Sequence, residues 1–171
     1  ATFPGDIERL SKRLMKRPVR VEVDSEHDMT SIRQILYEIP DKGARSTALL
    51  AVLQRHQPVS ALVFCQTKVL TEEIAAVLRD QGYMALAING DLDQKDRESR
   101  LVQFTNKSLT VLVATDVAAR GLDIDSLDLV INYHLTKDPE VHTHRIGRTG
   151  RAGSTGLACS LYHSSEAYKL E

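Results

Sequence analysis

The segment ALAINGDLDQKDRESRLVQFTNKSLTVLVA, residues 85–114, decides the fold. It opens with a short apolar run, Ala85–Ile88, and continues through a polar turn into a longer stretch, Gln94–Thr105. A second run, Thr110–Ala114, is rich in β-branched residues. Short apolar runs bounded by turn residues are typical of buried strands, and the longer stretch has the length of a helix. The segment therefore predicts a strand, a helix and a second strand.

The same alternation continues on both sides of this segment. The further strands and helices that we expect cover, in turn, Ile32–Ile39, Arg45–His56, Ala61–Cys65, Thr71–Gln81, Leu127–Tyr133, Glu140–Ile146 and Leu157–Tyr162. Strands that alternate with helices predict an α/β fold, a three-layer sandwich with a mainly parallel central sheet. In such sheets, ligands bind at the loops that follow the carboxyl ends of the strands.

The amino-terminal residues differ from this repeat. Between Pro4 and Arg17, apolar residues recur at helical spacing among Lys and Arg, and Pro18 ends the pattern. We expect a basic amphipathic helix there. The following VRVEV alternates apolar and charged residues and SEHDMT is polar, which predicts a strand-like entry, then a loop or linker near a domain boundary.

Composition restricts the class of protein. With 171 residues, 42% of them apolar and 26% charged, the chain can form one main domain with a full core. The apolar stretches are too short to span a bilayer and the first residues lack a secretory signal, so we expect a cytoplasmic protein with no membrane partner. A net charge of −1 argues against a general polyanion binder, so nucleic-acid contacts must come from local placement of Arg, Lys and backbone N–H groups.

No metal site is predicted. Cys65 and Cys159 lie in apolar runs, where buried reduced thiols are favoured over a disulfide or metal ligands. His142 and His144 have no Cys or carboxylate nearby that completes a ligand set. Asp91 and Asp93 lack the rest of a calcium loop.

Polar residues follow the expected strand Ala85–Ile88. Gly90 would let a phosphate approach the backbone, and the N–H groups of a helix start, together with Arg97, favour an anion. Gln94 and Arg97 are three residues apart and so share a face of the helix. Taken alone, the segment fits equally an ordinary turn followed by a solvated helix charge.

The run ATDVAARGLDI, residues 114–124, follows another expected strand. It combines a hydroxyl, Thr115, with small residues and with Arg120 and Asp123 on either side of Gly121. One interpretation is a capped turn with a local ion pair. The other is a carboxylate that accepts hydrogen bonds from ribose hydroxyls beside a phosphate-binding loop.

The run HRIGRTGR, residues 144–151, places Arg145, Arg148 and Arg151 within a glycine-rich stretch. Guanidinium groups match phosphate oxygens two at a time, and a positioned one stabilises the charge that develops in phosphoryl transfer. The chain has no G-x-x-x-x-G-K-[ST] loop, so such arginines would act on a nucleotide held mainly by something outside this sequence. The alternative is a surface basic turn in which Arg145 pairs with a nearby acid.

Four ordered motifs, LVFCQT (62–67), GDLDQKDR (90–97), VATDVAARGLDI (113–124) and HRIGRTGR, together resemble the second RecA-like domain of DEAD-box RNA helicases. The stretch DPEVHTHRIGRTGRAG (138–153) is similar to the DbpA-like branch, whose members act on ribosomal RNA. The resemblance implies that residues 1–18 end the first RecA-like domain after its Ser-Ala-Thr motif. It likewise implies that residues 19–31 form the interdomain linker and that residues 32–171 form the second RecA-like domain.

The resemblance also implies a division of roles. The first RecA-like domain, as partner, would hold ATP and Mg²⁺. In this chain, Arg148 and Arg151 would contact the γ-phosphate, with Arg151 as the arginine finger, and Gly121 and Asp123 would bind ATP, the carboxylate holding the ribose hydroxyls. His144 and Arg145 would organise the interdomain contact. The residues that would contact the RNA backbone are Thr67, Gly90, Gln94, Arg97 and Thr115.

The function that we expect is the C-terminal half of an ATP-dependent RNA helicase, inactive alone, with a role in ribosome assembly. Asn89 departs from the family pattern, which commonly has His before Gly-Asp, and so puts a role of that imidazole in doubt. One alternative is a stand-alone RNA-binding or scaffold module without ATP-linked activity. A flavodoxin-like signalling or cofactor domain would share the architecture but leaves the three arginines unexplained.

Overall fold

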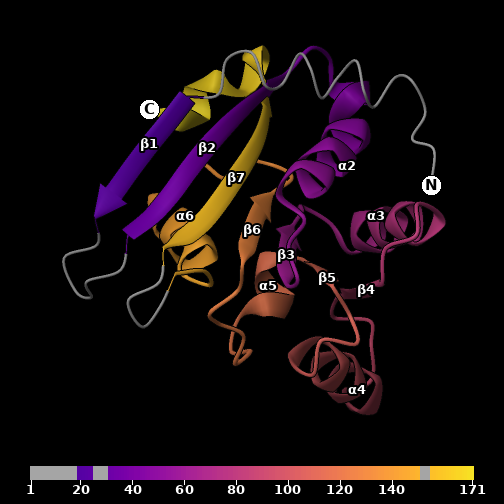
Figure 1. Ribbon diagram of the computed structural model, residues 1–171. Coiled ribbons are helices and arrows are strands. Elements are labelled where there is room, and N and C mark those ends of the chain that lie inside the picture. Colours follow the sequence, from indigo (N-terminus) through magenta and orange to yellow (C-terminus); the bar gives the residue numbers. More distant parts are fainter. Residues whose placement is uncertain (1–18, 25–30, 151–154) are drawn as a thin grey trace.

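The computed structural model describes residues 19–24, 31–150 and 155–171 (Figure 1). Their strands form one seven-stranded sheet in the order β1-β2-β7-β6-β3-β5-β4. All neighbouring pairs are parallel except β1 and β2, which are antiparallel. The strands are β1 (Val19–Asp24), β2 (Ser31–Ile39), β3 (Ala61–Phe64), β4 (Ala85–Ile88), β5 (Val111–Ala114), β6 (Leu129–Asn132) and β7 (Gly156–His163).

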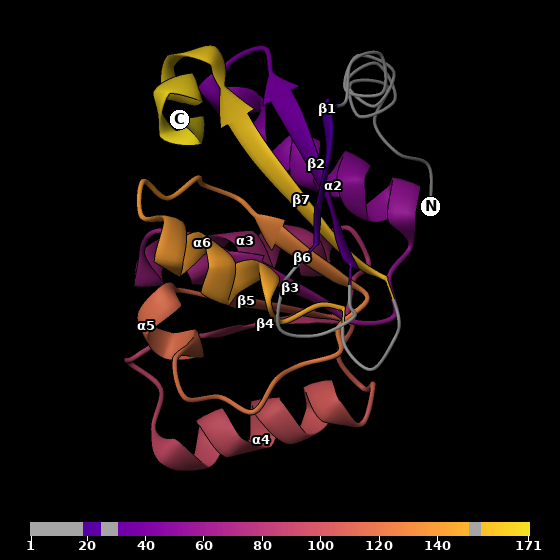
Figure 2. The same ribbon diagram turned by 90° about the vertical axis from the view of Figure 1, so that its left-hand side faces the viewer.

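Helices cover both faces of the sheet, as Figures 1 and 2 show. Helices α2 (Arg45–His56) and α3 (Lys68–Asp80) pack on one face. Helices α4 (Gln94–Thr105), α5 (Asp116–Ala119) and α6 (Pro139–Ile146) pack on the other. Two 3-10 helices, η1 (Lys42–Ala44) and η2 (Ser164–Leu170), lie at the ends of β2 and β7. The predicted α/β fold and its three layers are confirmed.

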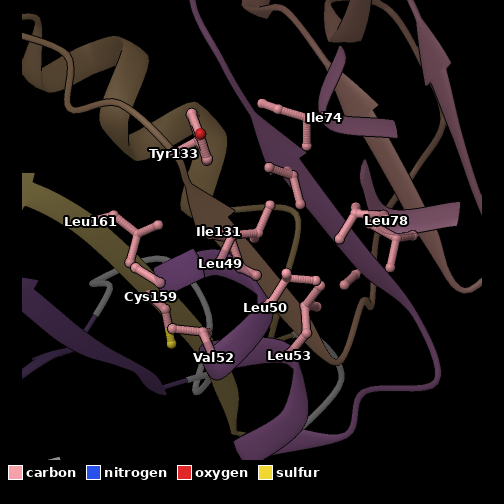
Figure 3. Close-up of a cluster of buried hydrophobic side chains, with 14 of the residues drawn as sticks. Leu49, Leu50, Val52, Leu53, Ile74, Leu78, Ile131, Tyr133, Cys159 and Leu161 are labelled. Carbon is pink, nitrogen blue, oxygen red and sulfur yellow. The ribbon is translucent and has the colours of Figure 1, made fainter. Parts of the chain in front are cut away.

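The alternation of side chains along the strands divides the core in two. Odd-numbered residues of β3 and β5, such as Val63 and Val113, face α2 and α3, and even-numbered ones, such as Leu62 and Leu112, face α4 and α5. Figure 3 shows the first cluster, in which Leu49 and Leu53 of α2 meet Ile131, Leu161 and neighbouring side chains. Because both faces are covered, all four residues of β3, β5 and β6 are buried.

Several element boundaries match the prediction and others do not. Helices α2 and α4 and strand β4 have the predicted bounds. Helix α3 begins at Lys68, before the predicted Thr71, because the Thr67 side chain accepts a hydrogen bond from Leu70 N and caps an earlier turn. Helix α5 and 3-10 helix η2 were not predicted, since four and seven residues are too few to show a helical period.

Strand β1 confirms the strand-like entry predicted from VRVEV, and the interdomain linker over residues 19–31 stays a prediction. The six residues of β1 pair with β2, with Val19 opposite Leu36 and Asp24 opposite Ser31. The alternation of apolar and charged residues in VRVEV suits an antiparallel edge strand. The helix predicted over 4–17 lies outside the described residues.

Both cysteines are buried and free, as predicted for reduced thiols. In the part of the chain that the structure describes, no three His, Cys, Asp or Glu side chains gather closely enough for a metal ion. Within the same ranges, no helix has the length and apolar character needed to cross a membrane.

Candidate functional site

Three loops lie side by side at the carboxyl edge of the sheet, because the strands that precede them, β3, β5 and β4, are neighbours. Each loop opens a helix whose first N–H groups are capped by a side chain. Thr67 accepts from Leu70 N at 3.2 Å, Thr115 from Ala118 N at 3.3 Å and Asp93 from Asp96 N at 2.8 Å. Helix starts present unpaired N–H groups and the positive end of the helix dipole, which favour phosphate oxygens.

The structure places the predicted RNA contacts on these three loops. Thr67, Gly90 and Gln94 are exposed, and Arg97 and Thr115 are half-buried. The Arg97 guanidinium donates a 2.8 Å hydrogen bond to the carbonyl of Ala118 and so joins α4 to α5. Arg97 is therefore fixed in place by the fold and is not a solvated helix charge.

Lys68 is a candidate that the sequence reasoning missed. Its ammonium group lies 3.0 Å from the Asp91 carboxylate, and a side chain at Gly90 would contact its stem. Lysine in the first turn of a helix is disfavoured by the helix dipole. That unfavourable position is the signal that could have identified Lys68 as part of an anion-binding surface.

Arg145 is buried, with 4% of its side chain exposed. Its guanidinium donates two hydrogen bonds to the Asp116 carboxylate, at 2.6 and 2.7 Å, and one to the carbonyl of His134 at 2.8 Å. It also stacks over the Phe64 ring, 5.4 Å from its centroid. Arg145 does pair with a nearby acid, as one interpretation of the sequence held, but inside the protein rather than at its surface.

Arg148 lies in a different environment. It is half-buried, and its guanidinium donates to the backbone carbonyls of Leu122 at 2.6 Å, Ile124 at 3.2 Å and Ala119 at 3.3 Å. Each of these three partners is a neutral carbonyl. The guanidinium thus lies against the loop that carries Gly121 and Asp123.

A groove of about 470 Å³ runs between this loop and α6. Asp123, His144 and Arg148 line this groove; Asp123 and His144 are exposed, and Arg148 is half-buried. Gly121 adopts a positive φ of 76°, which other residues rarely adopt, and so sets the turn that precedes Asp123. The groove therefore brings Asp123, His144 and Arg148 together.

Helix α5 joins the groove to the three loops. Its N-cap is Thr115, and its first residue, Asp116, binds Arg145. Its last two carbonyls, of Ala118 and Ala119, accept from Arg97 and Arg148. Arginine side chains often satisfy the free carbonyls at a helix end. Arg97 of α4, Arg145 of α6 and Arg148 after α6 therefore all bind α5, which is only four residues long.

The segment after α6 returns to the sheet through a close contact between two glycines. Gly150 has a φ of 67°, and a Cβ on it would lie 2.9 Å from the backbone N of Gly156 in β7. This close approach accounts for glycine at both positions. Arg151, the predicted finger, follows directly and lies outside the described residues.

Titratable groups near the site are shifted by burial. Burial raises the pKa of the Cys65 thiol to about 12, which keeps it protonated and excludes a thiolate nucleophile there. Burial lowers the pKa of His142, with a further lowering from the Arg145 cation. His142 is hydrogen-bonded to Gln34, 2.9 Å from its amide oxygen. His142 therefore links α6 to β2.

Comparisons with known proteins give a consistent family. The model of the helicase conserved C-terminal domain matches residues 44–153. The ATP-dependent RNA helicase DbpA of Escherichia coli is 48% identical over 99% of this chain and 37% of its own length. The DEAD-box ATP-dependent RNA helicase RhpA of Helicobacter pylori is 40% identical over 99% of the chain and 35% of its own length.

Solved structures agree with this assignment. The E. coli DEAD-box protein SrmB, bound to the regulator of ribonuclease activity A, matches with a TM-score of 0.74 and 32% identity over 79% of each chain. A DEAD box protein from Methanococcus jannaschii matches with a TM-score of 0.74 and 41% identity over 99% of this chain and 46% of that one. The chain spans 37% and 35% of the lengths of the two curated relatives named above. It belongs to the C-terminal helicase domains of DEAD-box RNA helicases.

Proposed function

We propose that this chain is the C-terminal half of an ATP-dependent RNA helicase. In this proposal it completes an ATP site that a preceding RecA-like domain holds, and it binds the backbone of one RNA strand. The observation that supports it most is the sharing of α5 by two surfaces: the groove with Asp123 and Arg148, and the three loops with Thr67, Gly90 and Thr115.

The groove suits the sugar and phosphates of a nucleotide. Asp123 is an exposed carboxylate that can accept hydrogen bonds from ribose hydroxyls, and the turn at Gly121 brings it to the groove. Arg148 can exchange neutral carbonyl partners for the charged oxygens of a γ-phosphate, since charge-assisted bonds are about twice as strong as neutral ones. ATP and Mg²⁺ would be held mainly by the preceding domain, and Arg151 would act as the finger.

The three loops suit an RNA backbone. The N–H groups at the starts of α3 and α4 can donate to successive phosphates, and Thr67, Gln94 and Thr115 add hydroxyl and amide donors. Gly90 leaves the backbone open to approach, and Arg97 and Lys68 supply positive charge. The chain has a net charge of −1, so this local placement would carry the binding.

His144 and Arg145 would act at the contact with the preceding domain. His144 is exposed at the groove and can meet that domain directly. Arg145 is buried, so it would act through the position that it gives α6.

Closure of the two domains over ATP would then bend the bound strand and separate a short duplex. Alone, this chain would neither hydrolyse ATP nor unwind RNA. A cytoplasmic role in ribosome assembly is the finer proposal, and it rests on the resemblance of residues 138–153 to the DbpA-like branch.

The test is Arg151→Ala in the whole protein that contains this chain. A finger acts on the charge of the transition state, so we expect kcat for RNA-stimulated ATP hydrolysis to fall by roughly 10³ to 10⁵. The KM for ATP should change by only about threefold, since most ground-state binding comes from the other domain. An unchanged kcat would refute the proposed function.

A further inference from the structure

Asn89, at the carboxyl end of β4, is buried, with 3% of its surface exposed. Its Oδ1 accepts from the backbone N of Asp91 at 3.0 Å. Its Nδ2 donates to Thr71 Oγ1 and to Glu72 Oε1, each at 3.2 Å. The opposite amide orientation would set Oδ1 against the Glu72 carboxylate, so these partners determine the orientation.

These contacts join two of the three loops. The bond to Asp91 forms a turn in which the Asn side chain holds the backbone two residues on, and this turn shapes Gly90 and Asp91. Thr71 and Glu72 belong to α3, and Thr71 Oγ1 also donates to the carbonyl of Lys68 at the start of that helix. A single buried amide therefore fixes the loop before α4 to the first turns of α3.

A second tie between the two loops is weaker. The Lys68–Asp91 ion pair spans 3.0 Å, but the two side chains are 56% and 74% exposed. Exposed pairs contribute about 0–1 kcal/mol and are screened by salt. The Asn89–Thr71 hydrogen bond is buried and the other two of Asn89 are partly buried, so together they hold the loop more firmly than the exposed ion pair.

We propose that Asn89 is a positioning residue for the RNA-backbone surface. It does not touch RNA; it sets the distance between the starts of α3 and α4, so that their N–H groups, Lys68 and Gln94 meet successive phosphates without reordering the loop. Preorganisation of this kind raises affinity by lowering the cost of ordering on binding. The inference rests on the proposed function, because it concerns the same surface.

Asn89→Asp tests it. The aspartate has the same shape and can still accept from Asp91, but it loses both donated hydrogen bonds and faces the Glu72 carboxylate. We expect affinity for a fluorescein-labelled oligouridylate to fall about three- to tenfold in the whole protein, as one or two hydrogen bonds imply. In ATPase assays, half-maximal stimulation should need correspondingly more RNA, while kcat at saturating RNA stays within about twofold.

Asn106→Asp is the matched control. Asn106 ends α4 near the opposite edge of the sheet, and its Oδ1 likewise accepts from the backbone N two residues on, in Ser108. The substitution adds the same charge and retains the same kind of turn. Its RNA affinity should stay within about twofold of wild type.

A second pair does not depend on how Asn89→Asp folds. Thr71→Val removes the hydroxyl that Asn89 binds, whereas Thr71→Ser retains it. We expect weaker RNA binding for the valine variant and rescue by serine. Asn89→Asp or Thr71→Val with wild-type RNA affinity would overturn the inference. If Gln94→Ala weakens RNA binding while those variants do not, the proposed RNA surface stands and only the positioning role of Asn89 is overturned. If no variant in the three loops changes RNA binding, the proposed RNA surface itself is wrong.

Discussion

Arg145 and Arg148 are three residues apart in one motif but occupy two different regions. Arg145 is 4% exposed, inside the layer between α6 and the sheet, and binds the Asp116 carboxylate twice. Arg148 lies at the groove and donates to the backbone carbonyls of Leu122, Ile124 and Ala119. The difference teaches that the partner of an arginine, rather than the motif that contains it, indicates whether the side chain is committed to the fold or available to a ligand.

Arg45 is a second arginine whose side chain is committed to the fold. It is 5% exposed, donates to the carbonyls of Tyr133 and Leu161, and pairs with Glu166 of η2 at 2.6 Å. Arg45 and Arg145 thus bind the consecutive carbonyls of Tyr133 and His134, just after β6. Each fastens a helix to the sheet through one carboxylate and nearby backbone carbonyls.

Arg145→Ala should have the largest effect on stability. It removes a buried guanidinium and leaves Asp116 and the carbonyl of His134 without this partner. Breaking buried pairs costs about 3–5 kcal/mol, and because Asp116 is 37% exposed we expect roughly 2–4 kcal/mol. Urea unfolding of this chain measures it. An unfolding midpoint equal to that of wild type would contradict the conclusion that Arg145 stabilises the fold whereas Arg148 is available to a ligand.

The pH dependence of folding stability can be tested at His134, whose carbonyl accepts a hydrogen bond from the buried Arg145. Burial lowers the pKa of His134 to about 4 from 6.5, and the Arg45 cation adds to this lowering. The folded state therefore resists a proton that the unfolded state accepts, so the contribution to stability is complete above pH 6.5 and is lost as the pH falls toward 4.

The measurement is the urea midpoint of wild type and His134→Gln across that window. Wild type should lose more stability than the variant as the pH falls. The pKa values of His56 and His142 are also lowered by burial, and the difference between the two proteins cancels their contribution. Parallel curves would show that His134 does not titrate in this way.

Asp138→Ala should have a smaller effect on the helix that carries Arg145. The Asp138 carboxylate caps α6 by accepting from Glu140 N at 2.9 Å and from Val141 N at 3.4 Å. Loss of such a cap costs about 1 kcal/mol, which thermal or urea unfolding would detect. Asp138→Ser retains a capping oxygen and should recover most of the loss; equal losses for Ala and Ser would argue against capping.

Arg148→Ala should have the smallest effect on stability. The groove that Arg148 lines is open, so water can replace the guanidinium at the carbonyls that it leaves. We expect a loss below about 1 kcal/mol in urea unfolding. A loss of stability as large as that of Arg145→Ala would show that both arginines are committed to the fold.

The sequence predicted the sheet well because its signals are local. Runs such as LVF in β3 and VLVA in β5 are apolar throughout, as strands buried on both faces require. The pairing of β1 with β2, the next strand along the chain, was missed because the polar SEHDMT between them was interpreted as a loop or linker at a domain boundary. The short helix α5 was missed because Asp116–Ala119 is a single turn held by arginines from elsewhere in the chain.

The candidate site was predictable as a set of loops but not in its internal order. The motifs placed Thr67, Gly90, Thr115 and Asp123 at the carboxyl edge, where the structure has them. The motifs could not show that Arg145 is buried and Arg148 lines the groove, because the burial of Arg145 and its pairing with Asp116 arise only in the folded chain. Two of the three hydrogen bonds of Asn89 likewise depend on α3, which is distant in sequence.

The most direct measurement is kcat for RNA-stimulated ATP hydrolysis by Arg148→Ala in the whole protein, together with its unfolding midpoint. The proposed function predicts that kcat falls by about 100-fold or more while stability stays within about 1 kcal/mol of wild type. A folded variant with kcat within about threefold of wild type would contradict the assignment of Arg148 to the ATP site.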